Sequence, residues 1–301
     1  MKIGVVGLGK MGQQIVKKLV DGGHKVVAFD VNKAAVEASK EYGAVGVVSR
    51  EELVEQLGPK PVVWMMIPAE FVDAEVDTLL KLLPKGSMLI DGGNSRYTQT
   101  IERAKRARKK GMSYVDVGTS GGVHGMTHGF SLMVGGSSVS FTVLEPALKT
   151  LAAPKGGYAY MGQSGRGHYV KMIHNGIEYA IMQAYAEGYD LLKYGEFKDI
   201  KLAEVARVWQ QGSIIESNLN GLIQEIFEEM HHFEYVSGYV AATGEGQWTY
   251  ETAQKYNVPM PALRESLQLR AASQNGYDTF ATKLLALMRN KFGGHDVRKK
   301  K

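Results

Sequence analysis

Four polar residues near the middle of the chain have side chains that could carry acid–base chemistry. Lys171, His174, Asn175 and Glu178 stand at i, i+3, i+4 and i+7, so at about 100° per residue they share one face of a predicted helix. Most of their neighbours in this helix are apolar, which predicts that the helix is largely buried. Buried charges are costly unless they are paired or used.

Two interpretations of this polar face are open. The first is a structural ion pair between Lys171 and Glu178, but their separation is too long for the usual local pair and leaves a gap between the two groups. The second is that a substrate fills the gap, which would make this face a catalytic site. The rest of the chain favours the catalytic interpretation.

The elements that must position this helix begin with a dinucleotide-binding pattern at the N-terminus. An apolar run at Lys2–Val6 is followed by the turn Gly7-Leu8-Gly9-Lys10-Met11-Gly12 and by a helical pattern at Gln13–Val20. Such glycines allow a tight turn, close approach of the backbone to a pyrophosphate, and close packing of helix on strand. The helix N-terminus favours the phosphate charge.

A second apolar run, Lys25–Phe29, ends at Asp30, eighteen residues after Gly12. An acid at this point would accept hydrogen bonds from the adenosine ribose hydroxyls. A carboxylate there would repel a 2′-phosphate, and the next residue, Val31, offers no compensating positive charge. NAD is therefore favoured over NADP. The alternative is that Asp30 only caps the following helix.

Strand and helix patterns alternate through the first 160 residues or so, which predicts an α/β fold with a doubly wound, mainly parallel sheet. Further strands are expected at Val62–Met66, Met88–Ile90, Tyr114–Val117, Phe130–Val134 and Tyr158–Met161, and helices around Arg50–Leu57, Glu70–Leu82, Thr98–Lys110 and Phe141–Leu151.

Ligands bind beyond the carboxyl ends of the strands in such sheets. Three turn segments fall at these ends, at residues 67–69, 91–95 and 118–122. Together they predict a pocket floor, in which Asn94 and Ser120 would be donors. The backbone of Gly121 and Gly122 would be open to a ligand.

Beyond residues 162–165 the alternation stops and helical periodicity takes over. We therefore expect a dinucleotide-binding domain at residues 1–164 and an all-α domain at residues 165–301. The expected helices of the second domain span residues 167–194, 200–211, 215–230, 247–256 and 261–290.

Composition excludes several classes of site and partner. The chain of 301 residues has no cysteine, which excludes disulfides, thiol catalysis and cysteine metal sites. It has no cleavable signal layout and no apolar run of about 20 residues, so we expect a cytoplasmic protein without a membrane partner.

The net charge of +5 does not indicate nucleic-acid binding, because two short basic runs at residues 105–110 and 298–301 carry nine positive charges, without which the chain would be at −4.

The adjacent pair His231-His232 has no third ligand at a matching spacing, and adjacent side chains on a helix diverge. We therefore expect no metal site there.

The motifs GLGKMG, DGGNS, GTSGG, VKMIHNGIEY, GEGQWT and RNKFGGH together resemble those of the decarboxylating 6-phosphogluconate dehydrogenases, in their short-chain form. The resemblance covers essentially the whole chain. GLGKMG and the SGG turn are shared with the wider β-hydroxyacid dehydrogenases, whereas KMIHNGIEY and the RNxFGGH tail are more specific.

The resemblance implies roles for individual residues. Lys171 would be the general base and Glu178 the general acid. The cofactor would contact residues 7–12, Asp30, Met66, Ile67, Pro68 and Asn94. The sugar acid would be held by Asn94, Ser120, Gly121, Gly122, His174 and Asn175, and its phosphate would be surrounded by Tyr179, Arg270, Arg289 and His295.

Two departures from the family pattern affect these expectations. Longer family members have Lys and Thr at the places of Thr243 and Glu245, where both contact the substrate, so the resemblance implies no substrate contact from this turn. The chain also lacks the second helical repeat of the longer enzymes. The resemblance implies a homo-oligomer, a dimer or tetramer, in which the tail after Gly293-Gly294 crosses to the neighbouring subunit.

Two other functions are open. Another β-hydroxyacid dehydrogenase, such as one for 3-hydroxyisobutyrate, would share Lys171 and Asn175 but would not need Arg270, Arg289 and His295. A nucleotide-sensing protein without turnover would have no use for a buried Lys171 and Glu178. The resemblance favours oxidative decarboxylation of 6-phosphogluconate with NAD, and NADP is a weaker alternative.

Overall fold

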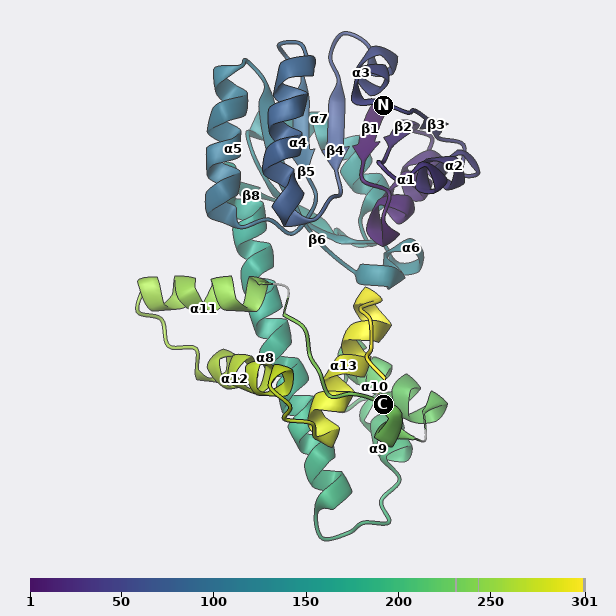
Figure 1. Ribbon diagram of the computed structural model, residues 1–301, viewed down its shortest axis with the longest axis vertical. Coiled ribbons are helices and arrows are strands. Elements are labelled where there is room, and N and C mark those ends of the chain that lie inside the picture. The colour runs from purple at the N-terminus through teal and green to yellow at the C-terminus, as the bar shows by residue number, and fades with distance from the viewer. Residues whose placement is uncertain (231, 243, 300–301) are drawn as a thin grey trace. The chain divides into compact units, whose positions relative to one another are not determined.

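The computed structural model describes residues 1–230, 232–242 and 244–299. The chain forms two compact units, Met1–Met172 and Ile173–Lys301 (Figure 1). One continuous helix, α8 (Arg166–Tyr194), contributes to both units. The domain boundary expected at residues 164 and 165 stays a prediction.

The first unit contains one eight-stranded sheet in the order β3-β2-β1-β4-β5-β6-β7-β8. All neighbouring strands are parallel except β6 and β7. The strands are β1 (Lys2–Val6), β2 (Lys25–Phe29), β3 (Val45–Gly46), β4 (Val62–Met65), β5 (Met88–Asp91), β6 (Ser113–Ser120), β7 (Ser131–Gly135) and β8 (Tyr158–Gly162). The expected doubly wound, mainly parallel sheet is confirmed.

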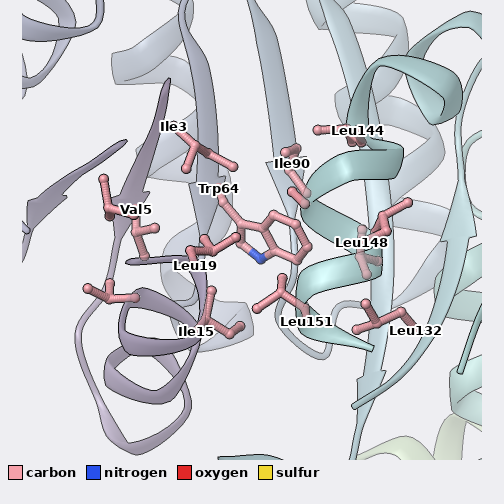
Figure 2. Close-up of a cluster of buried hydrophobic side chains, with 14 of the residues drawn as sticks. Ile3, Val5, Ile15, Leu19, Trp64, Ile90, Leu132, Leu144, Leu148 and Leu151 are labelled. Carbon is pink, nitrogen blue, oxygen red and sulfur yellow. The ribbon is translucent and has the colours of Figure 1, made fainter. Parts of the chain in front are cut away.

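Helices cover both faces of this sheet. They are α1 (Lys10–Asp21), α2 (Lys33–Lys40), α3 (Arg50–Leu57), α4 (Ala69–Leu82), α5 (Tyr97–Lys109), α6 (Gly125–His128) and α7 (Ser138–Leu151), with a short 3₁₀ turn at Gly122–His124. On one face the indole of Trp64 is enclosed by apolar side chains from the sheet, α1 and α7 (Figure 2). On the other face, α3, α4 and α5 contribute to a second buried cluster.

The second unit is helical. Its helices are the later part of α8, α9 (Leu202–Trp209), α10 (Asn218–Glu229), α11 (Glu245–Lys255), α12 (Pro261–Gln274) and α13 (Phe280–Gly293), with a 3₁₀ turn at Phe233–Tyr235. One buried cluster joins α8, α9, α10 and α13. The expected all-α second part of the chain is confirmed. No described helix is long and apolar enough to cross a membrane.

Two sequence-based expectations about elements are wrong. The single helix expected at residues 261–290 is broken, because α12 ends at an Asn275-Gly276 turn, where Gly276 has φ +96°, and a capping box at Thr279 starts α13. The turn expected at residues 118–122 begins later, since β6 continues to Ser120 and pairs with β7 along its whole second half.

Candidate active site

The glycine turn after β1 has the backbone geometry that a dinucleotide requires. Gly7 has φ +94°, and a Cβ there would lie 2.5 Å from the Met66 carbonyl oxygen. A Cβ at Gly12 would lie 2.0 Å from the Gly7 oxygen, whereas a Cβ at Gly9 would meet nothing within 4 Å. Gly7 and Gly12 therefore allow close backbone contacts in the turn, and Gly9 leaves open space at the start of α1. This arrangement fits a pyrophosphate at a helix N-terminus.

Asp30 follows β2 directly and faces the same turn. Its Oδ2 accepts a hydrogen bond of 2.6 Å from the Leu8 backbone N–H, and its Oδ1 accepts one of 2.7 Å from the Asn32 N–H. The helix α2 is capped by the Asn32 side chain. The geometry therefore does not support the alternative in which Asp30 only caps this helix. Val31 beside it is 82% exposed and uncharged.

The other expected cofactor residues lie at the same edge of the sheet. Met66, Ile67 and Pro68 follow β4, and a Cβ at Gly93, after β5, would lie 2.8 Å from the Ile67 carbonyl oxygen. Since β2, β1, β4 and β5 are parallel neighbours, the segments after their carboxyl ends line one edge. Asn94 is exposed on the last of these segments.

The Asn94 turn is held by a buried aspartate that sequence reasoning did not single out. Asp91 is fully buried at the end of β5, and its Oδ2 accepts hydrogen bonds from the Ser95 hydroxyl at 2.8 Å and the Tyr114 hydroxyl at 3.1 Å. Arg103 reaches the same oxygen at 3.4 Å. Burial and the Asp91 charge raise the pKa of Tyr114 well above its ordinary value, so its hydroxyl stays a donor.

A second buried aspartate, Asp116 in β6, fixes the start of α8. Its Oδ1 accepts from the Gly165 N–H at 2.7 Å, and its Oδ2 accepts from the His168 N–H at 3.0 Å. These are N–H groups at the helix start, which no intrahelical carbonyl can satisfy. The sequence signal for this role is that Asp116 is a charged residue inside the otherwise apolar strand expected at residues 114–117.

Lys171 lies one turn further along α8 and is 6% exposed. A Cβ at Gly118 would lie 2.4 Å from the Lys171 Cβ and 2.9 Å from the Gly167 oxygen. Gly118 therefore lets β6 and α8 approach closely enough to seat the lysine stem against the strand. Ser120 ends the same strand, and Gly121 and Gly122 follow it in the turn.

In the second unit, the polar face of α8 continues with three interacting residues. The His174 Nδ1 lies 2.9 Å from the Asn175 Oδ1 and 3.8 Å from the Glu178 Oε2. The Asn175 Nδ2 donates a hydrogen bond of 2.6 Å to the Glu245 Oε1 at the start of α11. Glu245 is a partner to which the resemblance assigns no role. Thr243 of the same turn lies outside the described residues.

Three of the four expected phosphate residues gather within this unit. The Arg270 guanidinium lies 3.6 Å from the Tyr179 ring centroid, and its Nε and Nη1 have no described hydrogen-bond partner. Burial lowers the pKa of Arg270 to about 10. Burial also lowers the pKa of Arg289, and the electrostatic influence of Tyr179, Glu178 and Glu245 opposes this shift. Two buried guanidinium groups in one unit would suit an anion.

The expectation that the C-terminal tail reaches away from its own body is wrong for its described part. The Ser237 N–H donates to the Arg298 oxygen at 2.9 Å, and Val236 forms an antiparallel bridge with Lys299. The Arg298 guanidinium lies 3.4 Å from the Tyr239 ring centroid. The tail folds back because these backbone groups pair within one chain.

His295, the fourth expected phosphate residue, lies against the end of its own helix. Its ring would contact a Cβ at Gly293, and its carbonyl accepts from the Asn290 side chain at 2.8 Å. No group of three or more His, Asp and Glu in the described ranges could hold a metal ion. Of the His231-His232 pair, His231 lies outside these ranges and the His232 side chain is 72% exposed.

Comparison with known proteins places the chain in a family. Residues 2–167 match the profile of the NAD-binding domain of 6-phosphogluconate dehydrogenase, and residues 167–300 match that of its C-terminal domain. YqeC of Bacillus subtilis is 43% identical over the whole of both chains. The NAD(+)-dependent, decarboxylating 6-phosphogluconate dehydrogenase of Haloferax volcanii is 42% identical over 100% of this chain and 99% of its own.

Solved structures agree with these matches. The 6-phosphogluconate dehydrogenase of Plasmodium falciparum is 30% identical with a TM-score of 0.82, over 91% of this chain and 62% of that one. The 3-hydroxyisobutyrate dehydrogenase of Mycobacterium tuberculosis has the same fold, with 21% identity and a TM-score of 0.74 over 96% of this chain and 99% of that one. Two family profiles that together cover the chain, and a relative of equal length, establish that the chain belongs to the 6-phosphogluconate dehydrogenase family.

Proposed function

We propose that the protein oxidises and decarboxylates 6-phosphogluconate to ribulose 5-phosphate and carbon dioxide, with reduction of NAD. The observation that carries the proposal is the pair of buried guanidinium groups of Arg270 and Arg289 close to Tyr179 and Glu178. A phosphate of nearly two negative charges would supply the partner that the Arg270 Nε and Nη1 do not have among the described residues. A dehydrogenase for a small unphosphorylated hydroxyacid has no use for such a site.

The cofactor would be held by the turn at residues 7–12, Asp30, residues 66–68 and Asn94. When bound there, NAD would supply the acceptor for the hydride of the substrate. The carboxylate of Asp30 and the uncharged Val31 support a preference for NAD over NADP, and the Haloferax volcanii relative is NAD(+)-dependent.

Lys171 is the proposed general base. It takes the proton of the C3 hydroxyl as that carbon is oxidised, for which a buried lysine is suited because burial favours its neutral form. The β-keto acid then loses carbon dioxide readily. The protonated Lys171 stabilises the oxygen charge of the enediol, and Glu178 donates a proton to C1 to give the ketopentose phosphate.

The remaining polar residues bind and orient the substrate. Asn94, Ser120, Gly121, Gly122, His174 and Asn175 would hold the sugar acid, and Tyr179, Arg270, Arg289 and His295 would hold its phosphate. The test is the rate of NADH formation with 6-phosphogluconate, together with detection of ribulose 5-phosphate. NADH formation with 3-hydroxyisobutyrate instead would favour the other dehydrogenase, and cofactor binding without turnover would favour a sensing protein.

We also propose that the protein is a homo-oligomer, either a dimer or a tetramer. Exposed apolar side chains on the second unit support this, among them Ile177 and Ile181 one turn apart on α8 and the neighbouring pair Ile214-Ile215. Light scattering during gel filtration measures the mass directly. A protein that elutes as a monomer at assay concentrations would contradict the proposal.

A further inference from the structure

A buried carboxylate stands behind the polar face of α8 in the second unit. Glu245 is 4% exposed, and its Oε1 accepts the 2.6 Å hydrogen bond from the Asn175 Nδ2. Asn175 is itself 7% exposed. Burying a carboxylate costs free energy unless its oxygens accept hydrogen bonds. The hydrogen bond from Asn175 therefore does more than pack α11 against α8.

Two glycines hold Glu245 at this place. A Cβ at Gly176 of α8 would lie 2.6 Å from the Thr249 Cγ2 of α11, and a Cβ at Gly246 of α11 would lie 2.6 Å from the Tyr179 ring of α8. The two helices therefore approach more closely than residues with side chains would allow. The position of Glu245 against Asn175 is built into the packing of α11 on α8.

The chemistry of the carboxylate fixes the orientation of its neighbours. An ionised carboxylate only accepts hydrogen bonds, so the Asn175 amide must turn its Nδ2 toward Glu245. Its Oδ1 then faces the His174 Nδ1 at 2.9 Å. An amide oxygen only accepts, and the Glu178 Oε2, 3.8 Å from the same Nδ1, is also an acceptor. In the neutral form of the His174 ring, the proton is therefore held on Nδ1.

We propose that Glu245 is a positioning residue that, through Asn175, sets the His174 tautomer so that its Nε2 accepts a hydrogen bond from a substrate hydroxyl. This rests on the proposed function for the identity of the substrate, a polyhydroxylated phosphosugar acid. The assignment adds a residue of α11 to the site without requiring it to touch the substrate. Replacing Glu245 releases the amide, which can then turn its nitrogen toward His174 and move the ring proton to Nε2.

The first test needs neither substrate nor turnover. Two-bond proton–nitrogen NMR of the full-length protein labelled in histidine separates the two tautomers, and a His174→Gln variant assigns the signal. We expect His174 of the wild-type protein to be protonated at Nδ1, and Glu245→Gln to populate the Nε2-protonated form, because a glutamine can offer either oxygen or nitrogen. A wild-type ring protonated at Nε2 would overturn the proposal whether or not any variant folds.

The second test is kinetic. Glu245→Gln should raise the KM for 6-phosphogluconate about tenfold, the equivalent of about one hydrogen bond, and leave the KM for NAD unchanged. The matched control is Glu265→Gln on α12, which removes an exposed carboxylate paired with Arg264 and should change neither constant. Unchanged constants and tautomer in Glu245→Gln, or an equal loss for both ligands, would refute a positioning role. A wild-type protein inactive on 6-phosphogluconate would contradict the proposed function instead, and the tautomer measurement would still decide the role of Glu245.

Discussion

At the scale of single residues, Lys171 and Glu178 have different proposed tasks on one helix face. Replacing Lys171 by Met removes the base at the oxidation step, and we expect kcat to fall by about 10²- to 10⁴-fold. Glu178→Gln should slow turnover less severely, because it affects only the later protonation. Initial rates of NADH formation measure both effects.

The control for these variants is cofactor binding, measured by calorimetry. It should survive both changes, since the glycine turn and Asp30 belong to other elements of the first unit. A Lys171→Met protein that keeps most of its wild-type kcat would refute the base assignment.

Cofactor choice is a second prediction at this scale. The double change Asp30→Asn with Val31→Arg removes a charge that repels a 2′-phosphate and adds a partner for it, at a side chain that is 82% exposed and so free to reach the phosphate. We expect kcat/KM to shift from NAD toward NADP by about tenfold or more, the equivalent of about 1.4 kcal/mol. Ratios of kcat/KM for the two cofactors, in both proteins, check this. A wild-type preference for NADP would contradict it.

The sequence was most informative where chemistry depends on local spacing. The turn at residues 7–12, Asp30 and the polar face of α8 could all be predicted, because each is defined by neighbours within one strand–turn–helix unit. The roles of Asp91, Asp116 and Glu245 could not, because each has a partner far away in sequence: Tyr114 for Asp91 at 23 residues, His168 for Asp116 at 52, and Asn175 for Glu245 at 70. Which distant N–H or hydroxyl groups a buried carboxylate accepts from depends on tertiary packing.

At the scale of elements, the contact of β6 with α8 positions the proposed base. In Gly118→Ala the new Cβ would stand 2.4 Å from the Lys171 Cβ, so helix and strand must separate. We expect a stability loss of about 1–3 kcal/mol from overpacking. A displacement of the lysine by about 1 Å could cost about 100-fold in kcat. Denaturant unfolding and steady-state kinetics check the two effects.

The matched control for this change is Gly188→Ala in the same helix, where a Cβ meets nothing within 4 Å. Because alanine is the better helix former, this variant should be as stable as the wild type or up to about 1 kcal/mol more stable, with unchanged kcat. A Gly118→Ala protein that behaves like Gly188→Ala would show that the close approach does not position Lys171.

Asp116 offers a separate prediction about the start of α8. Asp116→Asn replaces an acceptor-only group by one whose nitrogen cannot accept from the Gly165 or His168 N–H. One buried N–H then loses its acceptor, and we expect a loss of about 1–3 kcal/mol in the free energy of unfolding. An Asp116→Asn protein as stable as the wild type in denaturant would contradict this account of the helix start.

Element boundaries could be predicted from local signals in several places. Both β1 and β2 have the bounds that their apolar runs predict. The break between α12 and α13 was missed although its signals are local: the Asn275-Gly276 turn ends one helix and the Thr279 capping box starts the next. The two-residue strand β3 has too few residues for a periodic signal and exists through its pairing with β2.

At the scale of the whole molecule, the structure changes the expectation about shared sites. The described tail pairs with residues 236 and 237 of its own chain, and Arg289 lies close to Tyr179, Glu178 and Glu245 of its own second unit. We therefore expect the proposed acid Glu178 and the proposed phosphate ligand Arg289 to act in the same subunit. An oligomer would hold complete copies of this part of the site instead of exchanging it between neighbours.

Mixing of variant subunits tests this arrangement. Glu178→Gln should have a low kcat, and Arg289→Ala should have a KM for 6-phosphogluconate raised by about tenfold or more, since a charged hydrogen bond is lost. If both residues serve the same subunit, oligomers reconstituted from the two variants contain no site with both wild-type groups, and their activity at low substrate should equal the sum of the separate activities. Two affinity tags would verify that mixed oligomers form.

Mixing Lys171→Met with Glu178→Gln provides the baseline, because two residues on one helix cannot be separated by any exchange of subunits. Activity of the first mixture well above this baseline would contradict this arrangement and show that Arg289 shares a site with Glu178 of a neighbouring subunit.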